Sequence, residues 1–422
     1  MSKLGWIDFS SDERAKVKMV LAALNEPGTL DELGIGQIRD AFANRLFPGI
    51  STIQTRAKYF VTIARLLRDI QMGHANKSKS PQQWLENQEH ELAKQLVLTS
   101  QGLEVGVIGA ESIEQGGVSR RPSSIYWNGL KTFGIVHTPL SLKEFCSSLA
   151  ESSHIAHAAN HSHQEGTDDD DVDRMVRLID LPSYENNWQA DSQLNIHLSA
   201  NEAKFLQDKL MTAIASEHSV PAQILRIGGV TKLLNAYEDN DLKTSKEISF
   251  DVMTALLLRH QAVSESCKAL LAQAQTFSLA MEGPHIAYNY RLAEINGLEG
   301  LAQRLETQFA EWLVVVQQGD IFHPHCADNW FSALADNRIK PRSRRFVERF
   351  CLLMQQQASF FQIVALSDER ARENKGKRSL LSKKRNSEKW AGMRRLDYRW
   401  SIARQLLSDI DDGLSGESHV KR

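Results

Sequence analysis

Two groups of side chains have the types that bind metal ions or act as nucleophiles. The first group, His154, His157, His161 and His163, precedes the acidic run Asp168–Asp171, and closely spaced imidazole and carboxylate groups bind zinc or nickel. A functional metal site also needs ordered residues that support its ligands. This stretch is polar and poor in apolar residues, which is typical of a solvated linker. We therefore expect no functional metal site here, and adventitious metal binding stays open.

The second group is compact and contains a thiol. His323, His325 and Cys326 lie within four positions, with Asp328 close by, and a thiol becomes a nucleophile when a histidine activates it. Neighbours in sequence rarely have the required mutual geometry, because catalytic pairs are normally brought together by the fold. We predict no catalytic residue in this group, and metal binding by it stays open.

A glycine-dense stretch could in principle bind phosphate. It runs from Gly102 to Gly117 and includes Gly106 and Gly109. A phosphate loop requires the spacing GxxxxGK[ST], and a dinucleotide-binding turn requires GxGxxG. Neither spacing is present in this stretch. We accordingly expect no cofactor.

The strongest chemical signal is a concealed separation of charge. The chain has a formal net charge of -2, but the segment from Arg338 to Arg399 carries 18 lysines and arginines against 6 acidic residues. Local electric fields attract polyanions whatever the net charge is, so this basic segment predicts a nucleic-acid partner, and we favour DNA. An acidic protein partner and a merely solvated face are the alternatives. The predicted nucleic-acid-binding residues of this segment are Arg342, Arg344, Arg345, Arg349, Lys375, Lys377, Arg378, Lys383, Lys384, Arg385, Lys389, Arg394, Arg395 and Arg399.

A second basic element is expected near the N-terminus. The pattern predicts a helix over residues 51–70, capped by a serine or threonine, with Thr52, Gln54, Arg56 and Lys58 in its first turns. Helix starts bind phosphates through free backbone N–H groups, and the reading helix of a helix-turn-helix unit often contacts DNA with its first residues. These four residues therefore complete the predicted nucleic-acid interface. The alternative is an ordinary helix cap with surface cations.

Helical periodicity dominates the chain and predicts a mainly α, multi-helical fold with helix-turn-helix or winged-helix-like units and few short strands. No apolar run approaches the length that spans a bilayer, so we expect no membrane partner. The four cysteines are far apart in sequence, which argues against a disulfide framework and fits a reducing cytoplasm. We predict an N-terminal helical domain over 1–150, a His/Asp-rich linker over 151–185, a central helical domain over 186–325 and a basic helical region over 326–422.

Several local elements follow from apolar spacing and capping residues. Ser199 is expected to cap a helix, and the Glu282-Gly283-Pro284 sequence is expected to interrupt the helices over 250–316. The other expected elements are helices over 30–44, 84–96, 125–133, 342–366 and 396–410 and a short strand over 194–198.

Several sequence blocks resemble a bacterial family of unknown function. They are GWIDF at 5–9, DELGIGQIRDA at 31–41, LFPGISTIQTRAKYF at 46–60, RPSSIYWNGL at 121–130, FSLAM at 277–281 and LDYRW at 396–400. The resemblance implies genes encoded beside helicases and phospholipase-D-like nucleases in antiphage defence regions. It implies no established catalytic residue, so none is carried over to this chain.

Charge and resemblance together favour one function over two alternatives. We expect a non-catalytic DNA-binding subunit of a bacterial antiphage defence complex, with helicase or nuclease subunits as protein partners. The first alternative is a scaffold whose basic face docks such a subunit. The second is an unrecognised nuclease or effector.

Overall fold

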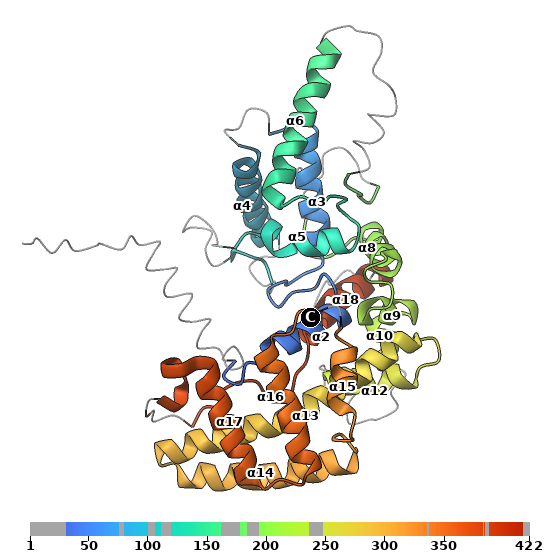
Figure 1. The fold of residues 1–422 in the computed structure, drawn as a ribbon. Helices are drawn as coiled ribbons and strands as arrows, with labels where there is room; N and C mark the ends of the chain where they lie inside the picture. Colours follow the sequence, from blue (N-terminus) through green and yellow to red (C-terminus); the bar gives the residue numbers. More distant parts are fainter. Residues whose placement is uncertain are drawn as a thin grey trace, which may run out of the picture. The chain divides into compact units, whose positions relative to one another are not determined.

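The computed structural model describes most of the chain as helices (Figure 1). It covers residues 31–75, 80–99, 106–110, 120–161, 178–183, 194–235, 248–335, 337–382, 384 and 388–416, with the backbone alone for 154–161 and 234. Within these ranges there are 15 α-helices, two short 3-10 helices and, in place of strands, one isolated bridge between Val136 and Ile179. The mainly α prediction is confirmed. Among these helices, none is both long and apolar enough to cross a membrane.

The chain forms two compact units, and each combines distant parts of the sequence. Unit 1 contains residues 31–43 and Ala269–Tyr398, and unit 2 contains Asn44–Lys268 together with 399–416. Both units are therefore discontinuous in sequence, and the contiguous domain ranges stay a prediction.

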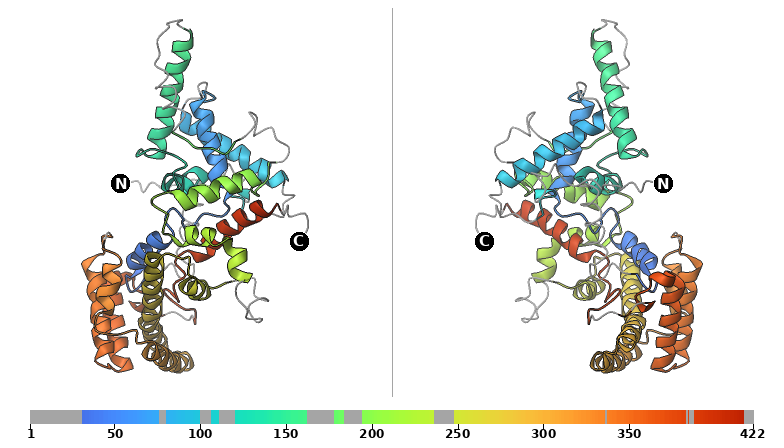
Figure 2. Two further views of the ribbon diagram at one scale, coloured as in Figure 1. Left: turned by 90° about the vertical axis from the view of Figure 1, so that its right-hand side faces the viewer. Right: turned by 90° about the vertical axis from the view of Figure 1, so that its left-hand side faces the viewer.

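Unit 2 is built on a hydrophobic helix surrounded by partners. α3 buries most of its residues and packs against α4, α5 and α6 (Figure 1), while α18 lies along α8 (Figure 2). The close approach of α18 and α8 requires Gly413, because a Cβ there would lie 2.7 Å from Cβ of Ala203. The helices of this unit are α3 (Lys58–Gln71), α4 (Pro81–Thr99), α5 (Pro122–Thr132), α6 (Leu142–His161), α8 (Ala200–Thr212), α9 (Val220–Arg226), α10 (Gly229–Asn235), α12 (Phe250–Arg259) and α18 (Trp400–Ser415).

The LFPGISTIQTRAKYF block forms a polar junction in unit 2. The Gln54 side chain folds back onto the turn, where its Nε2 donates to the Gly49 carbonyl at 3.0 Å and its Oε1 accepts from Ser51 N–H at 3.2 Å. The Tyr126 hydroxyl accepts from the N–H groups of Thr55 and Arg56 at 2.8 and 3.1 Å. These bonds replace helical ones, so the prediction of a helix from residue 51 is wrong, and α3 begins at Lys58.

The cations of this junction are buried against carboxylates. Arg56 Nε donates to Asp409 at 3.0 Å, and Asp409 also accepts from the N–H of Ala57 at 2.7 Å. Lys58 Nζ lies 2.7 Å from Glu202, whose carboxylate also accepts from the N–H of Ser199 in a capping box that starts α8. Charged groups taken out of water need such partners. The predicted Ser199 cap is confirmed.

A third buried carboxylate in unit 2 belongs to Glu89 on α4. It accepts a hydrogen bond from the backbone N–H of Ser123 at the start of α5, and its second oxygen has no partner among the described residues. Burial raises the pKa of Glu89 to about 7, because removal from water disfavours the charged form.

Unit 1 has an aromatic core. Phe309 of α14 packs against Phe360 of α17, and Trp312 stacks with Phe350 of α16. α16 and α17 lie side by side in Figures 1 and 2. The elements that belong wholly to this unit are α14 (Glu299–Gln318), α15 (Cys326–Ser332), α16 (Pro341–Gln355), α17 (Phe360–Lys375) and the 3-10 helices η2 (Gly376–Arg378) and η3 (Leu380–Ser382). α2 (Gly36–Leu46) and α13 (Glu265–Asn296) have residues in both units.

α13 continues through Pro284, so the predicted interruption at 282–284 is wrong. Proline removes one helical hydrogen bond, and the neighbouring turn is stabilised by tertiary contacts. The Trp312 ring packs against Gly283, where a Cβ would meet it at 2.3 Å, and its indole N–H donates to the Leu279 carbonyl at 2.8 Å.

Other predicted elements differ at their limits. The single helix expected over 342–366 is two helices, because the chain turns at Gln357, which has φ +54°, and restarts with a capping box at Ser359. The expected strand over 194–198 is irregular, and α6 extends to His161, into the predicted linker. The helix expected from residue 30 begins at Gly36, because Asp31 accepts from the N–H groups of Ile35 and Gly36. The helices expected over 84–96 and 125–133 correspond to α4 and α5.

Removing the carboxylate of Asp409 should destabilise unit 2. Asp409→Ala leaves the Arg56 charge buried without this partner, and we expect a loss of about 3–5 kcal/mol in the free energy of unfolding. Urea denaturation followed by circular dichroism measures the loss. Asp208→Ala is the matched control, because Asp208 pairs with Lys204 on the surface of α8, where such pairs contribute about 0–1 kcal/mol. Equal effects of the two variants would contradict the prediction.

Glu89 should make stability fall as pH rises. Its folded pKa of about 7 lies above the usual value of 4.5 for a glutamate. Its contribution to the free energy of unfolding is therefore complete at low pH and is lost as pH rises through this interval, by about 3 kcal/mol. Glu89→Gln should reduce the slope of the unfolding free energy against pH between pH 4.5 and pH 7. The exposed neighbour Glu91 gives the control Glu91→Gln. Parallel pH profiles for the wild type and Glu89→Gln would refute the assignment.

Candidate nucleic-acid interface

The structure places the thiol of Cys326 beside another cysteine. Cys326 is buried at the start of α15, and a hydrogen bond with Cys351 lowers its pKa while the same contact and burial raise the pKa of Cys351. Gln355 Nε2 also lies 3.9 Å from the Cys326 sulfur. Cys326 therefore interacts with a thiol and an amide in the protein interior.

The described residues contain no group of three or more histidine, cysteine or acidic side chains that could hold a metal ion. The cluster from His154 to Asp171 lies outside the side chains that the structure describes. Metal binding by that cluster stays untested.

Most of the predicted basic residues are exposed in unit 1. Arg399 instead belongs to unit 2, where its guanidinium donates to the side chain of Asn44 and the carbonyl of Ile50. Lys375 is half-buried, and Lys383 and Arg385 lie outside the described residues. The exposed members are Arg342, Arg344, Arg345, Arg349, Lys377, Arg378, Lys384, Lys389, Arg394 and Arg395.

Three of the four predicted N-terminal residues are buried and so do not present their side chains to a ligand. Gln54, Arg56 and Lys58 are 1%, 8% and 5% exposed and are engaged in the junction of unit 2. Only Thr52 of the four predicted residues is exposed. The expectation of a helix start that presents these groups to a phosphate is therefore wrong.

α16 carries the densest group of exposed cations. Several of them pair with acidic residues on the surface: Arg344 with Glu348 at 2.7 Å, Arg349 with Glu369 at 2.8 Å and Arg342 with Glu373 at 3.6 Å. Pairs of this kind contribute little to stability, so a phosphate can replace the carboxylate at small cost. Lys340 and Arg345 form no ion pair with any residue described in unit 1.

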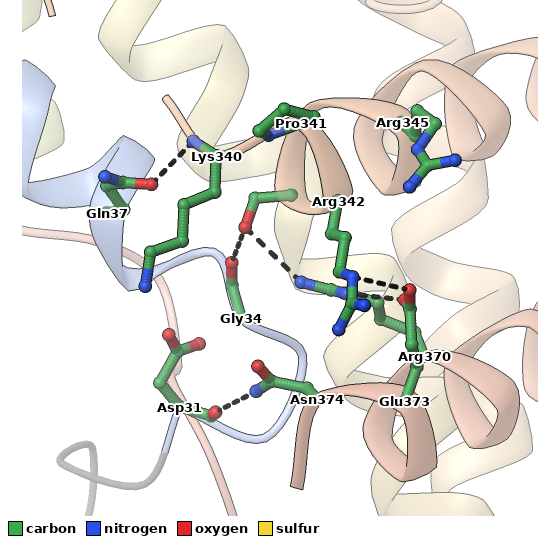
Figure 3. Close-up of a pocket in the computed structure, with 11 residues that line it drawn as sticks. Asp31, Gly34, Gln37, Lys340, Pro341, Arg342, Arg345, Arg370, Glu373 and Asn374 are labelled. Carbon is green, nitrogen blue, oxygen red and sulfur yellow. Dashed lines mark hydrogen bonds and ion pairs between the residues drawn. The ribbon is translucent and has the colours of Figure 1, made fainter. Parts of the chain in front are cut away.

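The DELGIGQ block holds the first turn of α16 in place. The Ser343 hydroxyl donates to the Gly34 carbonyl at 2.6 Å. The Gln37 side chain accepts from Lys340 N–H at 2.8 Å (Figure 3), and it donates to the Arg338 carbonyl at 2.7 Å. The backbone that carries Lys340 and Arg342 is thus fixed from both sides.

Arg370 of α17 lies beneath this turn. It is 5% exposed, and its guanidinium donates to the Leu33 carbonyl at 2.8 Å, to Glu373 at 2.6 Å and to the Ser343 hydroxyl at 3.3 Å. Gly34 makes this approach possible: its φ is +68°, and a Cβ there would lie 2.3 Å from Arg370 Nη2.

Glu32 ties the same block to more distant segments. Its buried carboxylate accepts from the hydroxyls of Tyr288 and Ser379, both at 2.9 Å. The Asn374 side chain donates to the carbonyls of Asp31 and Glu32 at 2.8 and 2.9 Å. One short block therefore connects α13, α16, α17 and η3.

The residues around these contacts line a cavity of about 540 Å³ that is open to solvent (Figure 3). A smaller hollow of about 220 Å³ shares Arg342, Arg345, Arg370 and Glu373 with it and extends along α16 to Arg349. Together they form a concave, mainly cationic surface. The cavity is lined by Asp31, Gly34, Gln37, Lys340, Pro341, Arg342, Ser343, Arg345, Arg370, Glu373 and Asn374.

Sequence reasoning identifies Arg342 and Arg345 but misses the other cationic and amide residues of the cavity. Lys340, Arg370 and Asn374 lie in the basic segment but are absent from the predicted site, and Gln37 comes from a distant part of the chain. The available signal was the glycine spacing of the DELGIGQ block, since Gly34 is needed for close approach to Arg370. That spacing does not name the distant partner.

Gly34→Ala should destabilise unit 1. The left-handed backbone costs an alanine about 1–2 kcal/mol, and displacement of Arg370 adds to that loss. Thermal unfolding should show a lower midpoint. Gly300→Ala on α14 is the control, because the nearest atom to its Cβ is 4.0 Å away and alanine favours the helix. An unchanged midpoint in Gly34→Ala would show that the contact with Arg370 is dispensable.

Comparison with known proteins gives a family and no described activity. Searches of curated proteins and of solved structures found no match. Residues 1–298 match the family of unknown function DUF6361, and this range includes the DELGIGQ block but ends before α14, α16 and α17. Because the match covers more than half of the 422 residues, the chain belongs to the DUF6361 family.

Proposed function

We propose that this protein binds nucleic acid, with DNA as the favoured form, through the exposed cations of α16 and the basic residues that follow it. In this proposal it is a non-catalytic subunit of a bacterial antiphage defence complex, acts in the cytoplasm and works with a helicase or nuclease subunit. The observation that carries the proposal is the concave cationic surface of α16, on which Arg342, Arg345 and Arg349 line adjoining hollows.

The spacing of these arginines suits a phosphate backbone. Residues 342, 345 and 349 are three and four positions apart, so they lie on one face of α16. Guanidinium groups bind phosphate through paired N–H donors. Each phosphate that is neutralised releases counterions, which makes the affinity depend steeply on salt.

The carboxylates on this surface favour exchangeable binding. Arg349 and Glu369 are both more than half exposed, so water and salt already weaken their pair. A polyanion can displace Glu369 without uncovering a buried charge. The arginines of this surface can therefore pair with the protein's own carboxylates in the free state and with phosphates in the complex.

The proposal predicts a salt-dependent affinity that the arginines of α16 control. Combined replacement of Arg342, Arg345 and Arg349 by alanine should weaken binding to a labelled duplex or single strand. Each lost phosphate contact should reduce the slope of log affinity against log salt by about 0.7–0.9. Fluorescence anisotropy of the full chain across a salt series measures both quantities.

Arg304→Ala is the matched control for this experiment. Arg304 is exposed on α14 in the same unit and pairs with Glu388, outside both hollows, so its loss should leave the affinity nearly unchanged. Absence of binding at low salt would overturn the proposal. Co-purification with an acidic subunit that survives nuclease treatment and needs the same arginines would then favour the scaffold alternative.

A further inference from the structure

We propose that the cavity between the DELGIGQ block and α16 binds a terminal phosphate monoester of a nucleotide, as carried by the end of a nucleic-acid strand or by a free mononucleotide. This deepens the proposed function and rests on it for the strand-end source. The exposed cations of the basic segment can bind any phosphate group, whereas the cavity suits a terminal phosphate.

The first argument is shape. A volume of about 540 Å³ is within the range of small-molecule sites, about 300–1,000 Å³. It can admit one nucleotide. Arg370 is 95% buried at its wall, so the cavity extends below the surface on which the other arginines lie. A chain end or a free nucleotide can reach this depth.

The second argument is charge. Lys340 and Arg345 line the cavity and form no ion pair with the described residues around them. A phosphate monoester carries about -1.5 to -2 charges at pH 7 because its second pKa is about 6. An internal phosphodiester carries one charge, so two unpaired cations suit the monoester better.

The two carboxylates that line the cavity offset only half of the charge of its four cationic side chains. Both oxygens of Asp31 accept backbone N–H groups, from Ile35 at 2.9 Å and from Gly36 at 3.0 Å. The carboxylate of Glu373 accepts from Arg370 and lies 3.6 Å from Arg342. The carboxylates thus position the surrounding elements, and Lys340 and Arg345 remain for a ligand.

The third argument is preorganisation. The backbone N–H of Lys340 is bonded to Gln37, Ser343 is bonded to Gly34, and Arg370 is held by three acceptors. A phosphate that enters the cavity therefore meets a fixed rim (Figure 3), which lowers the entropic cost of binding. The N-terminal end of α16 adds a favourable potential.

The test compares strands that differ only at their ends. Anisotropy titrations of the full chain use one labelled single strand with a 5′-phosphate, a 3′-phosphate or hydroxyl groups at both ends. We expect a terminal phosphate to strengthen binding by about five- to twentyfold, the range of one or two charge-assisted hydrogen bonds at a partly exposed site. This preference should shrink at pH 5, where the monoester carries a single charge.

Variants connect the preference to the cavity. Lys340→Ala and Arg345→Ala should each bring the ratio of affinities for phosphorylated and hydroxyl ends close to one, and Arg304→Ala should leave it unchanged. Both target side chains are exposed, so folding is expected to survive, and thermal unfolding checks this. A preference that persists in both variants would overturn the assignment to this cavity.

In a separate experiment, calorimetry measures the binding of a nucleoside 5′-monophosphate and of the matching nucleoside to the full chain. If the protein binds strands but shows no end preference and does not bind the mononucleotide, the cavity proposal is overturned and the proposed function stands. Mononucleotide binding that Lys340→Ala abolishes, without strand binding, would support the cavity with the free nucleotide as its source and overturn the proposed function. No binding of either ligand would overturn both.

Discussion

Buried carboxylates that must be matched by distant donors hold each unit together. In unit 1, Glu32 accepts from Tyr288 and Ser379. In unit 2, Asp409 accepts from Arg56, and Glu202 accepts from Lys58. An unpaired charge in the interior costs several kcal/mol, so these pairings strongly favour one arrangement of the segments. The helices supply the apolar area, and the carboxylates select which segments meet.

This constraint explains the two most specific sequence blocks of the chain. The LFPGISTIQTRAKYF block uses Gln54, Thr55 and Arg56 to fasten a turn to Tyr126 and Asp409. The DELGIGQ block uses Glu32 and Gly34 to bring α16 and α17 together. Most of their polar side chains form hydrogen bonds or ion pairs inside the protein. The first block is architectural, whereas the second also forms the wall of a cavity.

The sequence predicts the class of the fold and many helices because apolar spacing and caps are local signals. Ser199 illustrates this success, since its partner Glu202 lies three positions away. Pro284 illustrates the failure, because α13 continues through it and the tertiary contacts at this turn come from Trp312 on another helix. Arg56 looks like a surface cation until Asp409 is placed beside it. The candidate cavity follows the same rule: its cations are visible in the sequence, but the residues that enclose them are not.

The distance along the chain between paired charges has a consequence for biosynthesis. Arg56 and Asp409 are 353 positions apart, and a ribosome that adds about 5–20 residues per second needs roughly 20–70 s to cover that interval. During this time the α3 segment has left the ribosome while the carboxylate that neutralises Arg56 has yet to be made. The docking of α18 therefore follows the synthesis of α3 by that interval, and until then the charge of Arg56 lacks the carboxylate of Asp409.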